Sequence, residues 1–366
     1  MRIALIAEDY YPQLGGVPEH VHHLATELNA RGHEATVVTA RMLGRHVDPP
    51  FVRRVGTSLV IYSNGGVARI TVGWRLRNRL AALFGELRAD VVHVHGGLAP
   101  VLGLVAPRAA WRAGIPVVAT FHTWFPRSAG YTVFRRPLQA MLDRHAAAIA
   151  VSSVAVAAMG RYFSADWEII PNGVDVGAFH PDGRPPAPER GGAPRLLFLG
   201  RLEPRTGLGT ILAAMPRIAA RFPGVELTVA GDGPWGSAYR RRAARSGLKV
   251  RFLGPVFAAR PALYREADVY LAPTSRASFG TTLLEAMGCG APMLVSDIPA
   301  YREVAGPNAA FAPTGDPSAW ADAAIALLAD PVRRQAMSEA GRATALGFAW
   351  PRVVDRVLAV YQRVAR

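Results

Sequence analysis

The feature that most constrains the fold is an alternation of short apolar runs with helix-like segments, repeated along the whole chain. The runs lack the polar–apolar alternation of half-exposed strands, which is typical of parallel strands buried on both faces. They cover residues 3–7, 35–39, 91–94, 117–121 and 148–151 in the first half, and residues 195–199, 225–230, 250–253, 269–272 and 293–295 in the second. Strands that alternate with helices predict a doubly wound α/β sheet, and two series predict two such sheets.

The length agrees with two domains, because 366 residues exceed one typical core and favour domains of about 150–180 residues. Between the two series, residues 182–194 (D-G-R-P-P-A-P-E-R-G-G-A-P) are rich in Pro and Gly, which indicates exposed chain near a domain boundary. An amphipathic helix over residues 350–366 ends the chain and fits either domain. Two facing sheets leave a cleft at the carboxyl ends of their strands, where ligands bind.

Composition narrows the class of protein. Half of the residues are hydrophobic and 19% are charged, so we expect large buried cores and no general disorder. No run approaches the ~18 apolar residues of a membrane span, and the chain starts in a strand-like segment rather than a signal peptide. The single cysteine, Cys289, excludes an internal disulfide. We therefore expect a soluble, cytoplasmic protein.

The net charge of +15 indicates an anionic partner, either a phosphate-bearing ligand or an acidic membrane surface. Lys249 is the only lysine, and the other 41 of the 42 basic residues are arginine. Nucleic acid is disfavoured as a partner, because no basic run is interleaved with aromatic residues and no DNA-binding module is visible.

Several candidate ligand-binding residues follow predicted strands. Gly16, in a Gly-Gly pair before a helix, lets a ligand approach the backbone and the helix N-terminus, although an ordinary turn explains it equally. Arg201 and Arg205 follow the first strand of the second half and could clamp a diphosphate, with solvated surface arginines as the alternative. Gly231 ends the next strand, either as a plain turn or as a close approach to the same ligand.

Several histidines are candidate ligands for a sugar or for a metal ion. His122, in A-T-F-H-T beyond a strand end, could donate a hydrogen bond to a sugar hydroxyl, although a satisfied loop histidine is the simpler interpretation. His93 and His95 alternate on a strand, and we expect them to face opposite sides and to be structural. A zinc site is not expected on the first helix, whose histidines lack a suitably spaced acidic partner. These histidines are His20, His22 and His23.

Glu285, in F-G-T-T-L-L-E-A-M, is the strongest single candidate. A carboxylate at a helix start near a nucleotide site can accept both hydroxyls of a ribose. A helix N-terminal charge favoured by the macrodipole is its structural alternative.

Together these segments resemble the retaining GT-B-fold glycosyltransferases of glycosyltransferase family 4, which includes glycogen synthases. In appearance they are nearest to the bacterial phosphatidylinositol mannosyltransferases. The resemblance runs over nearly the whole chain. Its motifs are M-R-I-A-L-I, G-G-V-P-E-H-V, N-G-G-V-A-R, A-T-F-H-T, I-P-N-G-V-D, L-F-L-G-R-L-E-P-R, R-F-L-G, S-F-G-T-T-L-L-E-A-M and S-D-I-P-A-Y-R-E-V.

The resemblance implies a GT-B fold of two Rossmann-like, doubly wound domains facing a central cleft. The acceptor-binding domain would cover residues 1–170, with the helix over 350–366 crossing back onto it, and the nucleotide-sugar-binding domain would cover 171–349. Catalytic roles would fall to His122, Arg201 and Glu285. The implied donor-binding residues are Gly16, Arg201, Arg205, Gly231, Phe252, Val256, Phe279, Gly280, Thr281 and Glu285, and the implied acceptor-binding residues are Asn64, Arg69 and Thr123.

The implied reaction moves a hexose from GDP-mannose, or from a UDP-sugar, to a phosphate-bearing and lipid acceptor. Such enzymes retain the anomeric configuration through a short-lived oxocarbenium-like pair, in which the departing phosphate accepts the acceptor's proton. This route requires no metal and no cofactor. The helix-like segment 74–88 has a basic face with Arg75 and Arg79, which would rest on anionic lipid at the inner face of the membrane. A core-packed helix is the alternative. Its apolar face carries Leu76, Leu80, Leu83 and Leu87.

Departures from the family's pattern favour a different interpretation. Thr206 replaces a lysine for the diphosphate, and Ala277 replaces the first carboxylate of a Glu-x7-Glu pair. Pro18, Leu98 and Phe257 replace polar or acidic residues near the inositol and the base. A catalytically weak pseudo-glycosyltransferase with a binding role is therefore the second hypothesis. A nucleotide-sugar epimerase lacks an acid–base cluster here, and a nicotinamide enzyme lacks its G-x-G-x-x-G motif.

Overall fold

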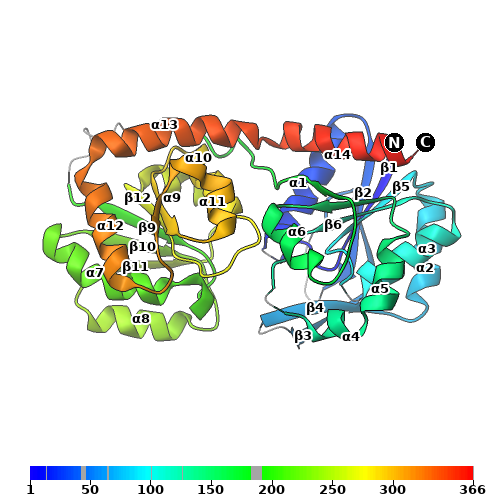
Figure 1. The fold of residues 1–366 in the computed structure, drawn as a ribbon, viewed down its shortest axis with the longest axis horizontal. Helices are drawn as coiled ribbons and strands as arrows, with labels where there is room; N and C mark the ends of the chain where they lie inside the picture. Colours follow the sequence, from blue (N-terminus) through cyan, green and yellow to red (C-terminus); the bar gives the residue numbers. More distant parts are fainter. Residues whose placement is uncertain are drawn as a thin grey trace. The chain divides into compact units, whose positions relative to one another are not determined.

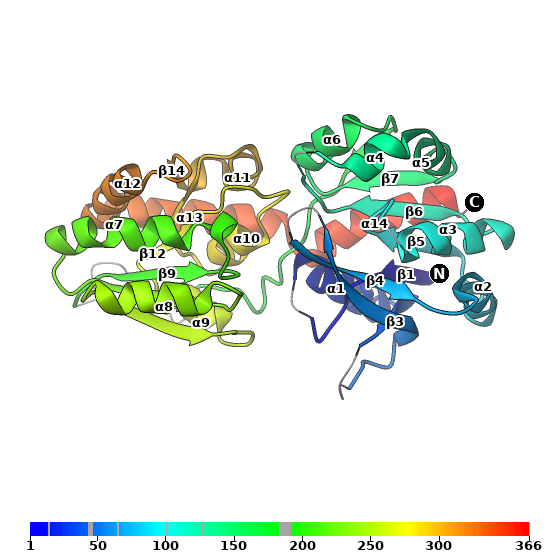
Figure 2. The same cartoon turned by 90° about the horizontal axis from the view of Figure 1, so that it is seen from below.

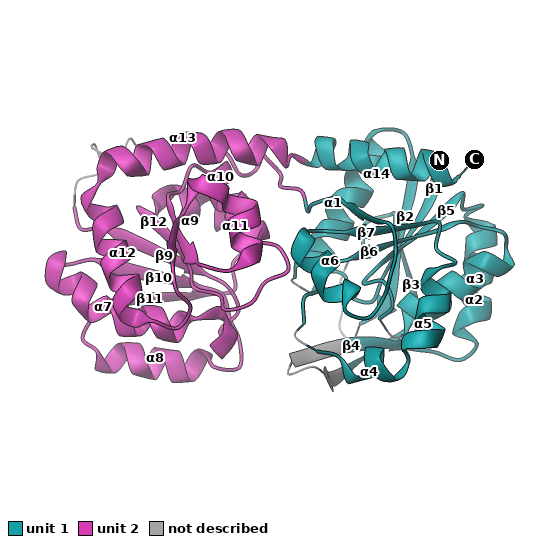
Figure 3. Ribbon diagram, in the orientation of Figure 1, with its two compact units in different colours: residues 1–172, 350–366 teal, residues 173–349 magenta. Residues whose placement is uncertain are grey.

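A computed structural model describes residues 1–13, 15–42, 47–63, 66–99, 101–125, 127–182 and 192–365. The chain divides into two compact units (Figure 3). Unit 1 comprises Met1–Asn172 and Trp350–Arg366, and unit 2 comprises Gly173–Ala349. The division falls two residues after the boundary predicted at 170/171.

Unit 1 is built on an eight-stranded sheet in the order β4-β3-β2-β1-β5-β6-β7-β8 (Figure 1). Its strands are β1 (Arg2–Ala7), β2 (Glu34–Arg41), β3 (Val52–Ser63), β4 (Gly66–Val72), β5 (Val91–His95), β6 (Val117–Phe121), β7 (Ala147–Ala150) and β8 (Trp167–Ile169). Only the edge pair β3 and β4 is antiparallel among these strands. That pair was not predicted, because its Arg, Ser and Thr residues interrupt the apolar run that identifies a buried strand.

Helices cover both faces of this sheet because successive strand residues point to opposite sides. Ile3 and Leu5 of β1 pack with the apolar residues of α1 and α14, whereas Ala4 and Ile6 pack with those of α2 and α3. The last helix thus belongs to unit 1, as the family resemblance implied. The helices are α1 (Gly16–Ala30), α2 (Leu76–Glu86), α3 (Leu102–Arg112), α4 (Ala129–Val133), α5 (Arg135–Leu142), α6 (Ser153–Gly160) and α14 (Trp350–Val364).

Unit 2 is built on a six-stranded, parallel sheet in the order β11-β10-β9-β12-β13-β14. Its strands are β9 (Arg195–Leu199), β10 (Glu226–Ala230), β11 (Lys249–Gly254), β12 (Val269–Ala272), β13 (Met293–Ser296) and β14 (Ala310–Ala312). The predicted strands of both halves are confirmed to within two residues at each end, and β8 and β14 are additional three-residue edge strands that are too short to stand out in the sequence.

The core on one face of the second sheet is formed mainly by α7, α12 and the strands beneath them (Figure 1, Figure 2). The helices of unit 2 are η2 (Pro204–Thr206), α7 (Leu208–Arg221), α8 (Gly236–Arg245), α9 (Arg260–Glu266), α10 (Thr281–Gly288), α11 (Pro299–Ala305), η3 (Gly306–Asn308), α12 (Pro317–Ala329) and α13 (Pro331–Gly347). With the parallel sheets, this arrangement gives two Rossmann-like domains.

The Pro- and Gly-rich stretch 182–194 lies within unit 2 rather than at the division between the units. The chain before it is already held by unit 2, because Arg342 Nη1 donates to the carbonyls of Phe179, at 2.8 Å, and Gly288, at 3.0 Å. Residues 183–191 lie outside the described part of the chain. Of the described helices, none combines the length and apolarity needed to cross a membrane.

Candidate active site

The order of the strands determines at which point along its edge each sheet can bind a ligand. The first strand of each unit lies between two neighbours whose connections leave in opposite directions: β1 between β2 and β5, and β9 between β10 and β12. Loops diverge at the carboxyl ends of such strands, and doubly wound sheets bind their ligands there. Gly16 follows β1 and Arg201 follows β9, so both predicted residues lie at these switch points.

Two arginines define the switch point of unit 2. Arg201 is exposed directly after β9 and forms no ion pair with another described residue. Arg205 lies in η2, and its side chain is 55% exposed with Nε 2.5 Å from Oε1 of Glu203. An unengaged guanidinium beside a second, only partly neutralised one provides the planar donors that bind a diphosphate.

Thr206, where the family pattern has a lysine, is turned back into its own loop. Its side chain is buried, and Oγ1 lies 2.6 Å from the Arg201 carbonyl and 2.7 Å from the Glu203 carbonyl. The single hydroxyl proton is therefore shared by two backbone acceptors. Thr206 fastens the loop that carries Arg201 and does not reach outward.

The loop that carries Ala277 packs directly on this arginine loop. The backbone N–H and the Oγ of Ser275 donate to the Arg205 carbonyl at 2.9 and 3.1 Å. Gly207 has a φ of +79°, and a Cβ there would lie 2.1 Å from the Pro273 carbonyl oxygen. The two departures from the family pattern, Thr206 and Ala277, thus lie on touching loops.

Helix α10 begins at Thr281, after Phe279 and Gly280. The Phe279 ring is buried, 6.2 Å from the ring of Phe348, and anchors the turn. No described side chain caps this helix end, and its first-turn N–H groups present partial positive charge. The three predicted residues therefore form the entry to an eight-residue helix whose N-terminus favours an anion.

Glu285 does not lie at a helix start, so that part of the prediction is wrong. It is the fifth residue of α10 and only 3% exposed. Arg260 Nη1 donates to Oε1 at 2.8 Å, and the Tyr264 hydroxyl donates to Oε2 at 3.0 Å. Burial raises the pKa of Tyr264 well above its ordinary value, so this phenol stays a donor. Both carboxylate oxygens are thus already engaged by α9.

The backbone itself requires a glycine at position 231. Its φ is +131°, and a Cβ would lie 2.0 Å from the Gly200 carbonyl oxygen. On the edge strand β11, the half-buried Phe252 ring lies 5.4 Å below the guanidinium carbon of Arg240. Val256, just beyond β11, is half-buried and its neighbour Phe257 is 48% exposed.

In unit 1, Gly16 is the exposed first residue of α1. A Cβ at this position would meet nothing within 4 Å, so the space beside the helix N-terminus is open to a ligand. Pro18 and Leu98, two further departures from the family pattern, are both buried.

His122 follows β6 and is 9% exposed, whereas the adjacent Thr123 is exposed. One His122 ring nitrogen, Nε2, lies 3.2 Å from Nδ1 of His95. The His20 ring centroid lies 4.7 Å from that of His122, and the Asn172 amide lies against both of these rings. His122 is thus set in a buried cluster of aromatic nitrogens.

The expectation that His93 and His95 face opposite sides is wrong, because residues two apart on a strand share a face. Their ring centroids lie 4.2 Å apart. His93 is satisfied, with Nδ1 2.6 Å from the Tyr361 hydroxyl and Nε2 2.7 Å from Thr120 Oγ1. Burial lowers the pKa of His93 to about 3 and that of His20 to about 4, and it lowers those of His95 and His122 well below the ordinary value.

Arg69 lies on β4 and interacts electrostatically with Asp9, which follows β1. Arg69 Nη1 lies 3.4 Å from Ser58 Oγ, whereas Arg69 Nε and Asp9 Oδ1 are buried without a hydrogen-bond partner. Burial raises the pKa of Asp9, and Arg69 offsets part of this shift. A guanidinium with unused donors at the end of β1 suits a phosphate group. Asn64, also predicted to bind the acceptor, lies outside the described residues.

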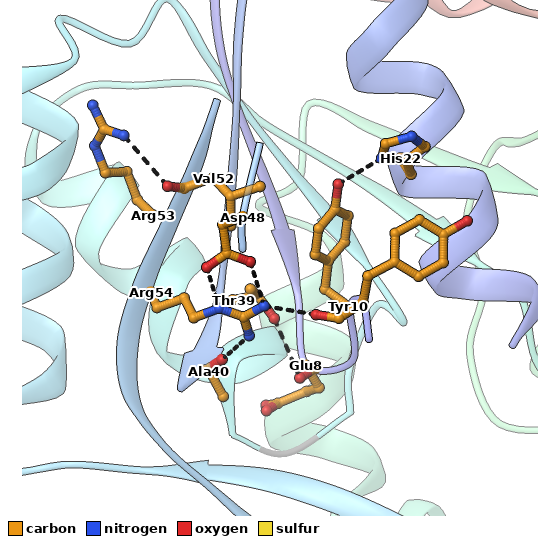
Figure 4. Close-up of polar contacts among 10 residues, drawn as sticks. Glu8, Tyr10, His22, Thr39, Ala40, Asp48, Val52, Arg53 and Arg54 are labelled. Atoms are coloured by element: carbon orange, nitrogen blue, oxygen red, sulfur yellow. Dashed lines mark hydrogen bonds and ion pairs between the residues drawn. The ribbon is translucent and has the colours of Figure 1, made fainter. Parts of the chain in front are cut away.

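Glu8 ties three elements together beside Arg69 and Asp9. Its Oε1 accepts the backbone N–H groups of Val101 and Leu102 at the start of α3, and its Oε2 lies 2.5 Å from Thr71 Oγ1 on β4. Burial is the main cause that raises the pKa of Glu8. The Thr39 hydroxyl lies 3.5 Å from the Glu8 carbonyl (Figure 4).

Arg54 holds the adjacent loops in place, as Figure 4 shows. Its guanidinium binds both oxygens of Asp48 at 2.7 Å and donates to the carbonyls of Ala40, at 2.7 Å, and Tyr11, at 2.6 Å. Because the four bonds join three other segments to β3, the arginine is a structural clamp and is not available to a ligand.

Three residues at this site were not predicted: Glu8, Asp9 and Asn172. The adjacent carboxylates Glu8 and Asp9 directly follow the first strand, and this position could have identified them as site residues. The carboxyl end of a strand lies at the edge of the sheet where ligands bind. Asn172 is part of the I-P-N-G-V-D motif, but no local sequence pattern predicts that its amide lies against His20 of α1 and His122 after β6.

The membrane contact was proposed for the basic face of the segment 74–88, and the apolar face of helix α2 lies opposite it. Leu76, Leu80 and Phe84 are buried against β-sheet and α3 residues, so this face packs in the core. The surface just before the helix is different, because Trp74 is 78% and Val72 37% exposed. The arginines exposed beside them are Arg75, Arg77 and Arg79.

Comparison with known proteins finds glycosyltransferase profiles and relatives that match this chain. The profile described as Glycosyltransferase Family 4 matches residues 14–178, and the profile described as Glycosyl transferases group 1 matches residues 193–330. A phosphatidyl-myo-inositol mannosyltransferase of Mycobacterium tuberculosis is 36% identical over 100% of this chain and 97% of its own. The enzyme of the same name from Mycolicibacterium smegmatis is 35% identical over 100% of this chain and 94% of its own.

Solved structures give the same fold. A sucrose-phosphate synthase from Thermosynechococcus elongatus superposes with a TM-score of 0.75 at 22% identity, covering 99% of this chain and 98% of the other. Anabaena HepE in complex with UDP superposes with a TM-score of 0.79 at 18% identity, covering 99% of this chain and 100% of the other. With its two Rossmann-like sheets and its full-length relatives, the chain belongs to glycosyltransferase family 4 and has the GT-B fold.

Proposed function

We propose that this glycosyltransferase is a retaining enzyme that moves a hexose, with mannose as the first choice, from a nucleotide diphosphate sugar to a phosphatidylinositol-type acceptor. The observation that carries the proposal is the full-length match to phosphatidyl-myo-inositol mannosyltransferases at 36% identity. Two arginines supply the cationic groups that a donor diphosphate and an acceptor phosphate need: Arg201 at the switch point after β9, and Arg69 on the edge strand β4, which interacts with Asp9 beyond β1.

On the donor side, Arg201 and Arg205 bind the diphosphate, and the N-terminal amides of α10 add a second anion-binding element. The donor is GDP-mannose, with a UDP-sugar as the alternative, and the base lies along the backbone from Phe252 to Val256. Because Glu285 is buried and both of its oxygens already accept bonds from α9, we give it a limited part in holding the ribose.

Transfer proceeds without metal. As the bond between the anomeric carbon and the diphosphate oxygen breaks, Arg201 stabilises the negative charge that develops on the phosphate. The departing phosphate then accepts the proton of the attacking acceptor hydroxyl on the same face, so the configuration is retained. His122 is neutral and donates a hydrogen bond to the transferred sugar.

On the acceptor side, Arg69 binds the phosphate, and Asp9 and Thr123 are placed to accept or donate hydrogen bonds to the headgroup. Unit 1 meets the membrane through exposed Trp74 and the arginines beside it, because an aromatic ring and cations suit the interface of an anionic bilayer. The protein then works as a peripheral enzyme at the inner face of the cell membrane.

A binding protein without turnover is the second candidate function. The observation that favours it is that Thr206 uses its hydroxyl inside the loop and that Ala277 offers no polar group. Losing a charge-assisted hydrogen bond at each position costs about 1.5–3 kcal/mol, and together about two to four orders of magnitude in rate if the losses add.

Calorimetric titration with GDP-mannose and a panel of UDP-sugars, without added metal, tests the proposal. Micromolar binding of one donor, followed by transfer to phosphatidylinositol in vesicles, is expected. The absence of binding by every donor at millimolar concentration contradicts the enzyme. The double variant Ala277→Glu with Thr206→Lys separates the two functions: a gain of donor binding or turnover supports the binding protein, and little change supports an already compensated enzyme.

A further inference from the structure

Three histidines from separate segments of unit 1 converge inside it. His20 comes from α1, His95 from the end of β5, and His122 from the loop after β6. One ring nitrogen of each lies within 4.8 Å of those of the other two. The rings are 3%, 4% and 9% exposed, so the cluster is buried with its most accessible edge at His122.

The polar atoms of this cluster are unusually poor in partners. His20 Nδ1 and His95 Nε2 are buried with no hydrogen-bond partner, and so is Oδ1 of the adjacent Asn172. Leaving a buried acceptor or donor unsatisfied is unfavourable, because the group has lost its hydration without gaining a partner. His93, whose ring touches that of His95, provides the contrast, because both of its nitrogens are bonded. His145 Nε2 is likewise buried without a partner, so what distinguishes the cluster is that its unsatisfied atoms occur on neighbouring side chains, those of His20, His95 and Asn172.

The donor set specifies the kind of ligand. Neutral imidazole nitrogens bind zinc and similar divalent transition metals, whereas magnesium and calcium prefer oxygen ligands. Tetrahedral zinc with Zn–N bonds of about 2.0–2.1 Å holds its ligand nitrogens about 3.4 Å apart. From separations of at most 4.8 Å, the three rings need side-chain shifts of an ångström or so to close on an ion. Three imidazoles leave a fourth position for water or for Asn172 Oδ1.

We propose that His20, His95 and His122 bind one divalent transition-metal ion, with Zn²⁺ as its representative. A consequence for activity, which rests on the proposed function, is inhibition, because the shift that brings the His122 ring onto the ion withdraws its N–H from the transferred sugar. Transfer itself needs no metal, so the ion acts as an inhibitor of the apo enzyme and not as its cofactor.

The test uses the full chain without a histidine tag, stripped with chelator and titrated with Zn²⁺ against a chromophoric competitor. We expect one equivalent to bind with a micromolar or lower dissociation constant. Co²⁺ in its place is expected to give the visible absorption of a nitrogen-ligated, four- or five-coordinate ion. Failure of the wild-type protein to bind Zn²⁺, or a Co²⁺ spectrum of a hydrated octahedral ion, overturns the proposal whatever the variants do.

Histidine variants test which residues bind the ion. His20→Asn and His95→Asn are each expected to weaken binding by more than about 100-fold, since loss of an outer-shell partner alone costs about 10–100-fold. The matched control is His23→Gln, one turn along the same helix, which is expected to keep the affinity. Affinity that survives both cluster variants but falls in the control places the ion at the Glu19–His23 pair and contradicts the proposal.

Activity is a separate readout. Zn²⁺ is expected to inhibit transfer with the same dissociation constant, and excess chelator is expected to restore it. If no transfer is found with any donor, the proposed function fails while stoichiometry and the Co²⁺ spectrum still decide the metal site. Inhibition that persists unchanged in His95→Asn shows that Zn²⁺ acts elsewhere.

Discussion

Replacing Glu285 with Gln distinguishes a buried anchor from a ribose ligand. The carboxylate lies in α10 with Oε1 2.8 Å from Arg260 Nη1 and Oε2 3.0 Å from the Tyr264 hydroxyl, both on α9. Gln has nearly the same volume and keeps one oxygen acceptor, so the packing of α10 on α9 is preserved. What the substitution removes is the negative charge opposite Arg260.

The magnitude follows from burial. The side chains of Arg260 and Glu285 are 18% and 4% exposed, so water replaces little of the lost bond. A hydrogen bond to a charged group contributes about 1.5–3 kcal/mol. For a unit of about 180 residues, 1 kcal/mol lowers Tm by about 2–4 °C, which predicts a fall of about 3–12 °C for Glu285→Gln.

Circular dichroism melting of the wild-type protein and the variant measures this fall. Tyr264→Phe is the matched control, because it removes one neutral donor to the same carboxylate and leaves the ion pair. It is expected to lower Tm by about 2–4 °C, from a net hydrogen-bond contribution of about 1 kcal/mol. Calorimetric donor titration on both variants accompanies the melts.

The reasoning is refuted if Glu285→Gln melts within about 1 °C of the wild type while its donor affinity falls at least tenfold. That result would mean that the carboxylate contributes its energy to the nucleotide and not to the contact between α9 and α10. A large fall in Tm with little change in donor affinity identifies the anchor.

Three other perturbations test the neighbouring structure. Burial raises the pKa of Glu8 above its unfolded value of 4.5, so the charged form of this side chain is disfavoured in the fold. Glu8→Gln should therefore raise Tm at pH 8, and this gain should vanish as the pH falls towards 4.5. Thermal melts of both proteins across this pH range measure the gain. Thr206→Val removes only the bonds to two carbonyls and should cost about 1 kcal/mol in urea unfolding without changing donor affinity, whereas a weaker donor would mean that the hydroxyl faces the ligand. Trp74→Ser with Arg77→Glu should reduce cosedimentation with anionic vesicles by at least about fivefold, and an unchanged bound fraction would rule out this surface as the membrane contact.

The sequence by itself determined the architecture and the family. Mainly apolar runs without alternation, such as residues 117–121 and 195–199, specify buried parallel strands, because this pattern is local and repeats wherever helices cover both faces. The same local logic fails at β3 and β4, where an exposed edge pair needs no apolar run. Motifs in a fixed order, such as S-F-G-T-T-L-L-E-A-M, were sufficient to identify the family, because each motif is recognised without knowing which residues it contacts in the fold.

Only the tertiary structure decided which side chains meet. Glu285 was expected at the start of a helix, but it lies inside α10, and its engagement by Arg260 depends on how α9 packs beside that helix. The cluster of His20, His95 and His122 joins residues up to 102 positions apart, since the sheet order sets β1, β5 and β6 side by side. Local periodicity determines on which side of a strand or helix a residue lies. Strand order and helix packing determine which other residues it contacts, and these depend on the sequence of the whole chain.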